Sequence, residues 1–207
     1  MIKQNIQHFL GKILFYMGEK CIKPLILNYR NTVLKRQLKG VGENFFVESD
    51  HKILNPHYIS IGNNFYAWNQ CRIEAIDSYY KEKYQPTIMI GENVSIGPYF
   101  HLGCINQIII GNNVLIGSKV FITDHTHGKV DKLKDLDLPP EKRKLASKGS
   151  VIIGESTWIG DAVCILSGVK IGKNVIIGAN SVVTRDVPDN AIIGGVPARL
   201  IRIIDGK

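Results

Sequence analysis

This sequence lacks long apolar runs, paired cysteines and a high density of charge. No window approaches 18 consecutive apolar residues, which argues against a membrane-spanning helix. The N-terminus has no small-residue cleavage pattern of a secretory signal. The four cysteines are scattered without a C-x-x-C pair, as suits free thiols in a reducing cytoplasm. Because 44% of the 207 residues are hydrophobic and only 21% are charged, a disordered chain is excluded and a cytoplasmic globular protein is expected.

The sequence does contain a six-residue repeat. An aliphatic residue, usually followed by Gly, recurs every six residues in groups of three, with only two long interruptions. Its positions are Val41, Val47, Ile53; Ile61, Ala67, Ile73; Ile90, Ile96, Leu102; Ile110, Ile116, Ile122; Ile153, Ile159, Ile165; and Ile171, Ile177, Val183. Three hexads make one turn of a triangular coil with the aliphatic side chains inside, so the repeat predicts a parallel β-helix of about six coils over residues 41–204.

The corners of the predicted coils have their own signal. Asn follows the aliphatic residue by three positions at Asn44, Asn64, Asn93, Asn113, Asn174 and Asn180. Asn is one of the few side chains that tolerates left-handed backbone geometry, so these residues are expected at corners. Val94, Val114, Val163 and Val175 are then expected to supply a second inward side chain.

Residues 1–40 differ from the rest of the chain in charge. They hold eight Lys and Arg residues against one acid, Glu19, a net +7 out of +8 for the whole chain. Apolar residues at helical spacing predict an amphipathic helix, broken near Gly18 and Pro24. We expect its apolar stripe mainly to cap the first coil, while its basic face makes weak, salt-sensitive contact with an anionic membrane surface. Nucleic acid is not expected as a partner, because the segment has no recognisable binding motif.

The two interruptions of the repeat predict inserted loops, residues 74–89 and 123–152. The first is polar and rich in Tyr, and is either a surface decoration or the rim of a substrate cleft. The second is longer and begins with two of the six histidines, His125 and His127, directly after a predicted strand. Because long loops on a rigid scaffold seldom lack a function, we expect the active site at this second loop.

At these residues the chain resembles a known family, the hexapeptide-repeat acyltransferases. The specific signal is SKGSVIIGESTWIGDAVCILSGVKIGKNVIIGANSVVTRDVPDNAIIGGVPARLIR, residues 147–202. The resemblance implies a left-handed β-helix, a homotrimer and acetyl-CoA as acyl donor. The ITDHTHG segment, residues 122–128, is most similar to members that O-acetylate capsule, O-antigen or exopolysaccharide sugars, and it is also similar to maltose and galactoside acetyltransferases. One departure is Ser167, which stands where relatives usually have Pro.

The resemblance also implies catalytic residues. His125 matches the family's catalytic His and is expected to act as the general base that deprotonates a sugar hydroxyl, with His127 as the alternative base or an acceptor-binding residue. Asp124 either orients the imidazole or only caps a turn. Trp158 either lines the active site or covers a trimer interface. Cys104 and Cys164 show no Cys-His signature, so direct transfer is expected rather than an acyl-enzyme.

The remaining expectations concern the cofactor and the acceptor. The pantetheine arm of CoA is expected beside Gly160, Gly178 and Ala179, and its phosphates beside Arg185, Arg199 and Arg202. A backbone N–H from the Gly160 corner is a candidate oxyanion donor. The acceptor is expected to be a sugar, a nucleotide sugar or a lipid-linked oligosaccharide, and no metal is expected.

Two other functions fit the same fold. A γ-type carbonic anhydrase would hold zinc with three converging His residues, but His125 and His127 are only two residues apart and His101 precedes Leu102 directly, so the three do not stack equivalently. A non-catalytic β-helix used as a binding or structural module would not need the long His-containing loop.

Overall fold

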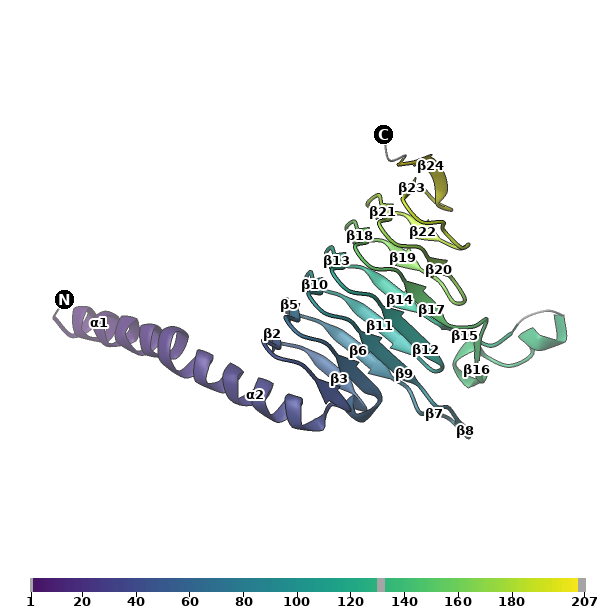
Figure 1. Ribbon diagram of the computed structural model, residues 1–207. Helices are drawn as coiled ribbons and strands as arrows, with labels where there is room; N and C mark the ends of the chain where they lie inside the picture. The colour runs from purple at the N-terminus through teal and green to yellow at the C-terminus, as the bar shows by residue number, and fades with distance from the viewer. Residues whose placement is uncertain (1, 130–132, 205–207) are drawn as a thin grey trace. The chain divides into compact units, whose positions relative to one another are not determined.

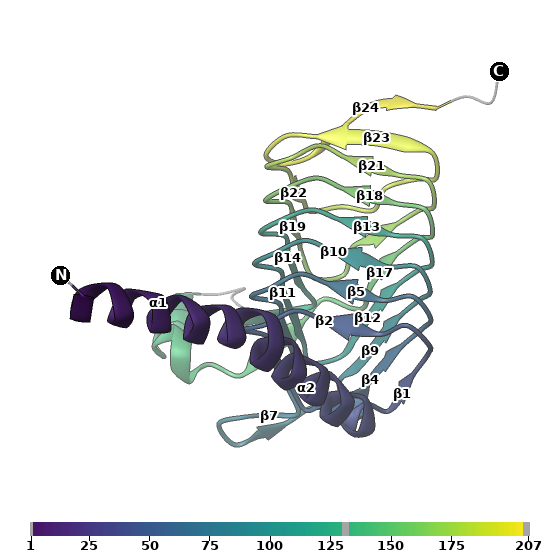
Figure 2. The same cartoon turned by 90° about the vertical axis from the view of Figure 1, so that its left-hand side faces the viewer.

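The computed structural model describes residues 2–129 and 133–204 and contains two compact units, with the boundary after Arg36. The larger unit is the predicted left-handed parallel β-helix (Figure 1). Its short strands form three sheets, which are the three flat faces of the coil, and Figure 2 shows the coils as stacked parallel rungs. Each face takes one strand from every coil.

In every coil the chain passes over the three faces in the same order. The first face contains β1 (Gly40–Val41), β4 (Ile59–Ile61), β9 (Thr87–Ile90), β12 (Gln107–Ile110), β17 (Val151–Ile153) and β20 (Lys170–Ile171). The second contains β2 (Phe46–Val47), β5 (Tyr66–Ala67), β10 (Ser95–Ile96), β13 (Leu115–Ile116), β18 (Trp158–Ile159), β21 (Ile176–Ile177), β23 (Ala191–Gly194) and β24 (Arg199–Ile203). The third contains β3 (Lys52–Leu54), β6 (Arg72–Ala75), β11 (His101–Cys104), β14 (Phe121–Thr123), β19 (Cys164–Ile165) and β22 (Val182–Val183).

The register of the strands follows the six-residue repeat. On the first face the paired residues are Val41, Ile61, Ile90, Ile110, Ile153 and Ile171. The other two faces pair the second and third members of every predicted triplet in the same way. Nearly all of these side chains are buried, and each buried aliphatic side chain contributes about 1.5–3 kcal/mol. The prediction of six coils is therefore confirmed.

The structure adds a partial seventh coil that the repeat did not predict. Val187 bridges to Ile171 and Ile193 pairs with Ile177, so both continue existing rows. Strand β24 then folds back antiparallel to β23.

The predicted corner residues all have left-handed backbone conformations, with φ between 53° and 58° for the six Asn residues. Their side chains also form a ladder from coil to coil. Asn44 donates to Asn64, Asn64 to Asn93 and Asn93 to Asn113, over distances of 2.8–2.9 Å. The ladder gives the amides of Asn44, Asn64 and Asn93 an acceptor in the next coil. Val94, Val114, Val163 and Val175 are buried, as predicted.

Both loop excursions leave the same corner of the prism. Strands reach into the expected loops, so the excursions run over residues 76–86, between β6 and β9, and 124–150, between β14 and β17. The first contains the hairpin β7 (Ser78–Tyr79) and β8 (Glu82–Lys83), and the second pairs β15 (His125–His127) with β16 (Leu145–Ser147). Short 3₁₀ turns are Pro56–Tyr58, Leu133–Leu136 and Pro140–Lys142. In both loop excursions the chain passes from the third face to the first face.

The smaller unit is helical. Helix α1 (Ile2–Met17) continues through a π-helical turn, Gly18–Ile22, into α2 (Lys23–Gln37). The predicted break near Gly18 and Pro24 is a π-helical turn rather than an end of the helix, because Lys23 N–H donates to the carbonyl of Gly18 and the chain stays helical. Pro24 has no N–H, and its ring would crowd the carbonyl four residues earlier, so a wider turn before it lets the helix pass.

Large apolar side chains of this helical unit are exposed. Between 40% and 72% of the residue surface is accessible at Leu10, Ile13, Leu14, Phe15, Tyr16, Met17, Ile22, Leu25, Ile26 and Tyr29. In the part of the chain that the structure describes, no helix is long and apolar enough to cross a membrane.

Candidate active site

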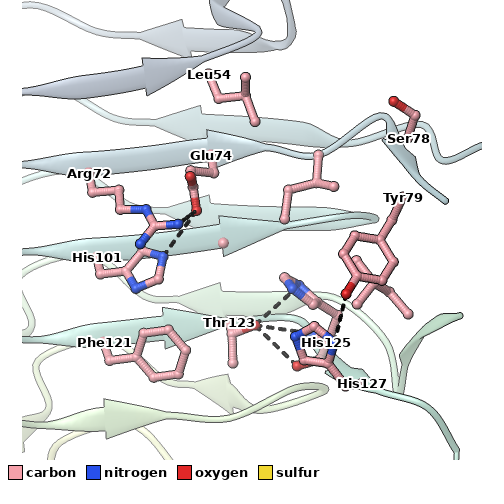
Figure 3. Close-up of a pocket in the computed structure, with 13 residues that line it drawn as sticks. Leu54, Arg72, Glu74, Ser78, Tyr79, His101, Phe121, Thr123, His125 and His127 are labelled. Carbon is pink, nitrogen blue, oxygen red and sulfur yellow. Dashed lines mark hydrogen bonds and ion pairs between the residues drawn. The ribbon is translucent and has the colours of Figure 1, made fainter. Parts of the chain in front are cut away.

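A cavity of about 460 Å³ lies on the third face, below the two loop excursions (Figure 3). Two rows of outward side chains form its floor, one residue from each successive strand. The first row is Arg72, His101 and Phe121, and the second is Leu54, Glu74, Gly103 and Thr123. Side chains of the loops, among them Tyr79, His127 and Leu145, form the wall.

His125 lies at the edge of this cavity and is hydrogen-bonded through one ring nitrogen. Its Nδ1 is 3.1 Å from Asp124 Oδ1 and 3.2 Å from Thr123 Oγ1. A carboxylate can only accept a hydrogen bond, so the Nδ1 proton points at Asp124 and Nε2 is left as a proton acceptor. This arrangement is the one that a general base on an imidazole requires.

Asp124 combines the two roles that the sequence left open. It is completely buried, and its carboxylate accepts hydrogen bonds from the backbone N–H groups of Ile105, at 2.9 Å, and Asn106, at 2.8 Å. It therefore caps the corner between β11 and β12, one coil before its own. Because two backbone donors fix the carboxylate, it also holds the imidazole of His125 in place.

Gly103 is the floor under the imidazole. A Cβ atom at this position would lie 3.1 Å from His125 Cε1 and 3.8 Å from Nε2. No backbone atom is near it, so the only group that would have to move is the ring itself.

We expect Gly103→Ala to lower turnover about tenfold or more with little change in melting temperature. The methyl group would turn the imidazole away from Asp124, and small misplacements of a catalytic group are costly. Steady-state kinetics and a thermal melt test this. Gly40→Ala on β1 is the matched control, because its nearest heavy atom would be Ser60 Oγ, 3.8 Å away on β4. Full turnover in Gly103→Ala would contradict this role for Gly103.

The two loops are tied to each other above the cavity by two tyrosines of the first. Tyr79 donates to the carbonyl of Glu141 at 2.7 Å, and its hydroxyl lies 3.4 Å from His127 Nδ1. Tyr84 accepts from Leu145 N–H at 2.9 Å and donates to the Leu145 carbonyl at 3.2 Å. Burial raises the pKa of Tyr84, so its hydroxyl keeps the proton that this second bond needs. His127 is thus an exposed wall residue bonded to Tyr79 rather than to a carboxylate.

Ser167, the departure from the family pattern, holds both ends of the long loop. Its hydroxyl donates to the carbonyl of Asp124 at 2.5 Å and accepts from Lys148 N–H at 2.8 Å. A proline has no hydroxyl and could make neither bond. Gly168, which follows, has a φ of +83° and so makes the turn that Ser167 needs.

Cys104 lies beneath the site but is not a nucleophile. Its thiol is buried and donates to Asp124 Oδ2 at 3.3 Å. Burial, with the nearby charge of Asp124, raises its pKa well above the ordinary range. Because only the thiolate attacks an acyl group, this supports direct transfer.

Trp158 and Gly160 lie away from the cavity within one chain. Trp158 is on the second face, in register with Leu115 and Ile176, and half of its side chain is exposed. The N–H of Gly160 donates to the carbonyl of Ile177 at 2.9 Å. The ladder between coils thus uses the N–H of Gly160 itself, and an oxyanion donor elsewhere at the Gly160 corner stays a prediction.

The expected CoA residues lie in the last coils. A Cβ on Gly160 would meet the backbone of Ala179 at 2.7 Å, so Gly160, Gly178 and Ala179 stack closely at one corner. Arg185 and Arg199 line a small cavity of about 150 Å³. Arg202 is on β24, paired with Ile192, and is not part of that lining.

Sequence reasoning missed most of the cavity floor. Arg72, His101 and Phe121 each come directly before the third aliphatic residue of a coil, and Glu74, Gly103 and Thr123 each come directly after it. The repeat therefore contained the signal, because residues at equal places in successive coils lie in one row. The pairing of His101 with Phe121 confirms that His101 does not stack equivalently with His125.

No group of three His, Cys, Asp or Glu side chains suited to a metal ion occurs among residues 2–129 and 133–204.

A β-helix of six-residue repeats with a His–Asp pair at a cavity on one face has the architecture of a hexapeptide-repeat transferase. Comparison with known proteins agrees. Residues 150–185 match the family model described as bacterial transferase hexapeptide (six repeats).

Curated relatives and solved structures point the same way. The chain is 39% identical over 153 residues to the "Putative lipopolysaccharide biosynthesis O-acetyl transferase WbbJ" of Escherichia coli, covering 72% of this chain and 74% of the relative. It is 32% identical to the galactoside O-acetyltransferase of Escherichia coli, covering 95% and 79%. A maltose O-acetyltransferase structure from Clostridium difficile superposes with a TM-score of 0.58 at 27% identity, covering 85% and 75%. The N-acyltransferase AntD from Bacillus cereus has the same fold, with a TM-score of 0.69 at 24% identity, covering 85% and 88%.

These matches establish that the chain belongs to the hexapeptide-repeat acyltransferases. It is accordingly an enzyme, and the alternative of a non-catalytic β-helix is set aside.

Proposed function

We propose that this enzyme transfers the acetyl group of acetyl-CoA to a sugar hydroxyl during the synthesis of a surface polysaccharide. The observation that carries the proposal is the His125–Asp124 pair, whose free ring nitrogen lies at the edge of a cavity large enough for a sugar. The names of the relatives support a sugar acceptor, since one is assigned to lipopolysaccharide biosynthesis and another to galactosides.

In the proposed reaction His125 Nε2 takes the proton of the acceptor hydroxyl as its oxygen attacks the thioester carbon. The tetrahedral intermediate then breaks its C–S bond, and the imidazolium returns the proton to the sulfur of CoA. Asp124 stabilises the imidazolium without taking its proton, because its carboxylate is fixed by two backbone N–H groups. The acetyl group thus passes directly from CoA to the acceptor oxygen, and no covalent enzyme intermediate forms.

We further propose a homotrimer in which neighbouring chains share each active site. One chain offers its His125 at the third face and its exposed Trp158 at the second face, and the two residues come from adjacent coils. In a ring whose axis runs along the coils, the second face of one chain meets the third face of the next at equal height. The donor would then lie in the groove, with its pantetheine beside Gly160, Gly178 and Ala179 and its phosphates near Arg185, Arg199 and Arg202.

An acetyl-transfer screen tests the proposed function. Purified protein is incubated with acetyl-CoA and a panel of monosaccharides, nucleotide sugars and oligosaccharides, and CoA release is measured together with the mass of the acceptor. Acetylation of a sugar oxygen is expected. Transfer only to amines, or CoA release without an acetylated product, would contradict an O-acetyltransferase.

We propose that the helical unit brings the enzyme to the cytoplasmic face of a membrane, near a lipid-linked acceptor. Two properties support this: the exposed apolar side chains of α1 and α2, and a net charge of +7 over residues 1–40. The capping of the first coil, which concerns how the two units are placed, stays a prediction.

The full chain is expected to sediment with anionic vesicles, to be released from them in high salt, and not to bind neutral vesicles. Replacing Lys12 and Lys20 by Gln should weaken binding about 5-fold per lysine, because each is worth about 1 kcal/mol near an anionic surface. Lys170→Gln, an exposed lysine on β20, is the control. Binding that survives both salt and the substitutions would contradict an electrostatic contact. A lower melting temperature after deletion of residues 1–35 would confirm capping.

A further inference from the structure

The end of the cavity away from the long loop carries a charged cluster that the transfer step does not use. Glu74 Oε2 lies 2.7 Å from Arg72 Nη2 and 3.3 Å from His101 Nε2, and Glu74 Oε1 lies 3.3 Å from Lys52 Nζ. Only 8% of the Glu74 side chain is exposed, whereas 48% of Arg72 and 64% of Lys52 are exposed. Figure 3 shows Arg72, Glu74 and His101 together on one side and His125 on the other.

This cluster has a surplus of positive charge. Burial alone would raise the pKa of Glu74, but the hydrogen bond and charge of Arg72, together with Lys52 and His101, hold it below its ordinary value. Burial, aided by the charge of Arg72, lowers the pKa of His101, so this ring is neutral at neutral pH. Two cations therefore face one carboxylate: Arg72 lines the cavity with Glu74, and Lys52 is paired with Glu74 beside it.

Glu74 also fixes the direction of Arg72. A guanidinium has five N–H donors in a planar fork, and Glu74 is bonded to its Nη2. The fork is suited to bind a carboxylate or a phosphate by two parallel hydrogen bonds. Glu74 is thus a positioning residue for Arg72.

The cluster lies within reach of the reacting group. Arg72 is one strand away from His101, and Glu74 is one strand away from Gly103, over which the His125 ring lies. Neighbouring strands are about 4.8 Å apart, so the separation is close to the width of one sugar ring. The rings of His101 and Phe121, with centroids 5.0 Å apart, supply an aromatic part of the floor on the side of Arg72.

We propose that Arg72 and Lys52 form a subsite for an oxyanion that the acceptor carries beside its reacting sugar. The oxyanion is either the carboxylate of an acidic sugar or the phosphate of a nucleotide- or lipid-linked sugar. This inference rests on the proposed sugar acetyltransferase activity, and it adds that acidic acceptors are preferred over neutral ones.

Matched acceptors test the preference. Methyl glucuronide is compared with methyl glucoside, and uridine diphosphate galactose with galactose, at saturating acetyl-CoA. In the wild-type enzyme, kcat/KM is expected to favour the charged member of one pair by about tenfold or more. Arg72→Ala should reduce that ratio to about 1–3 through a higher KM for the charged acceptor, and Arg72→Lys should restore part of it. Lys170→Ala, which removes an exposed cation from β20, should keep the wild-type ratio.

A binding measurement separates this inference from the proposed function. Calorimetry with glucuronate and with uridine diphosphate needs no turnover, and wild-type protein is expected to bind one of them and Arg72→Ala to bind it at least tenfold more weakly. Binding of glucuronate alone indicates an acidic sugar, and binding of uridine diphosphate alone indicates a phosphate.

If a probe binds through Arg72 but no acceptor is acetylated, the proposed function fails and the subsite stands. If neutral and charged acceptors react equally and neither probe binds, the subsite fails and the proposed function stands. An unchanged preference in Arg72→Ala would also overturn the inference.

Discussion

Replacing His125 with Ala is expected to lower turnover by about 10²–10⁴-fold, which is the usual contribution of a positioned general base. The affinity for acetyl-CoA should be nearly unchanged, because the expected donor residues belong to the last coils. Since His125 is bonded to Asp124 through Nδ1, Asp124→Asn should also lower turnover, as the amide no longer favours the Nδ1–H tautomer. The measurements are kcat with a saturating acceptor and calorimetric binding of acetyl-CoA.

His127→Ala is the matched control, because this side chain is also at the cavity but is bonded to Tyr79. We expect a moderate effect, mainly on the KM of the acceptor. Full activity of His125→Ala would remove this residue from the mechanism. If His127→Ala alone abolished turnover, the two roles would have to be exchanged.

Mixing two inactive variants is expected to restore activity if each site is shared between neighbouring chains. Trp158→Ala should lose about 10²-fold if its ring N–H donates to the reacting group. When His125→Ala and Trp158→Ala chains are unfolded together and refolded as mixed trimers, about a quarter of the interfaces combine an intact His125 with an intact Trp158. Activity should therefore rise to about a quarter of the wild-type value.

The assembly itself is checked by light scattering, where three 23.1-kDa chains give about 69 kDa. Separately refolded variants mixed without unfolding are the control and should stay inactive. A fully active monomer, or mixed trimers no more active than the two parents, would contradict the shared site.

The β-helix could be predicted in detail because its constraint repeats. Every aliphatic position of the six triplets pairs with the same position of the next coil, since shifting a strand by one residue would turn its buried side chain outward. The corner Asn residues are likewise fixed by local backbone geometry rather than by distant contacts. Local rules of this kind can be read from a single sequence.

The loop wall of the cavity could not be predicted from the sequence. It depends on individual contacts between the two loops, which do not repeat from coil to coil. The bonds of Tyr79 and Tyr84 to the second loop join residues about sixty positions apart, and no pattern in the sequence pairs them. Ser167 was noted only as an exception, although its hydroxyl joins both ends of the long loop. Asp124 was expected either to orient the imidazole or to cap a turn, but the sequence did not indicate that the turn belongs to the preceding coil or that one carboxylate does both.

The common corner from which both loops depart has a consequence for how such enzymes diversify. The strands on either side of each excursion keep the pairing of uninterrupted coils, so Ile110 still pairs with Ile153 across an excursion of 27 residues, 124–150. A loop at this corner can thus be lengthened, shortened or exchanged at little cost to the prism. His125 and Asp124 belong to the strand exit, whereas Tyr79 and Tyr84 belong to the interchangeable part. An exchange of residues 76–86 together with 128–144 between relatives is therefore expected to change the loop wall of the cavity, while Arg72 and Lys52 stay in place on their strands.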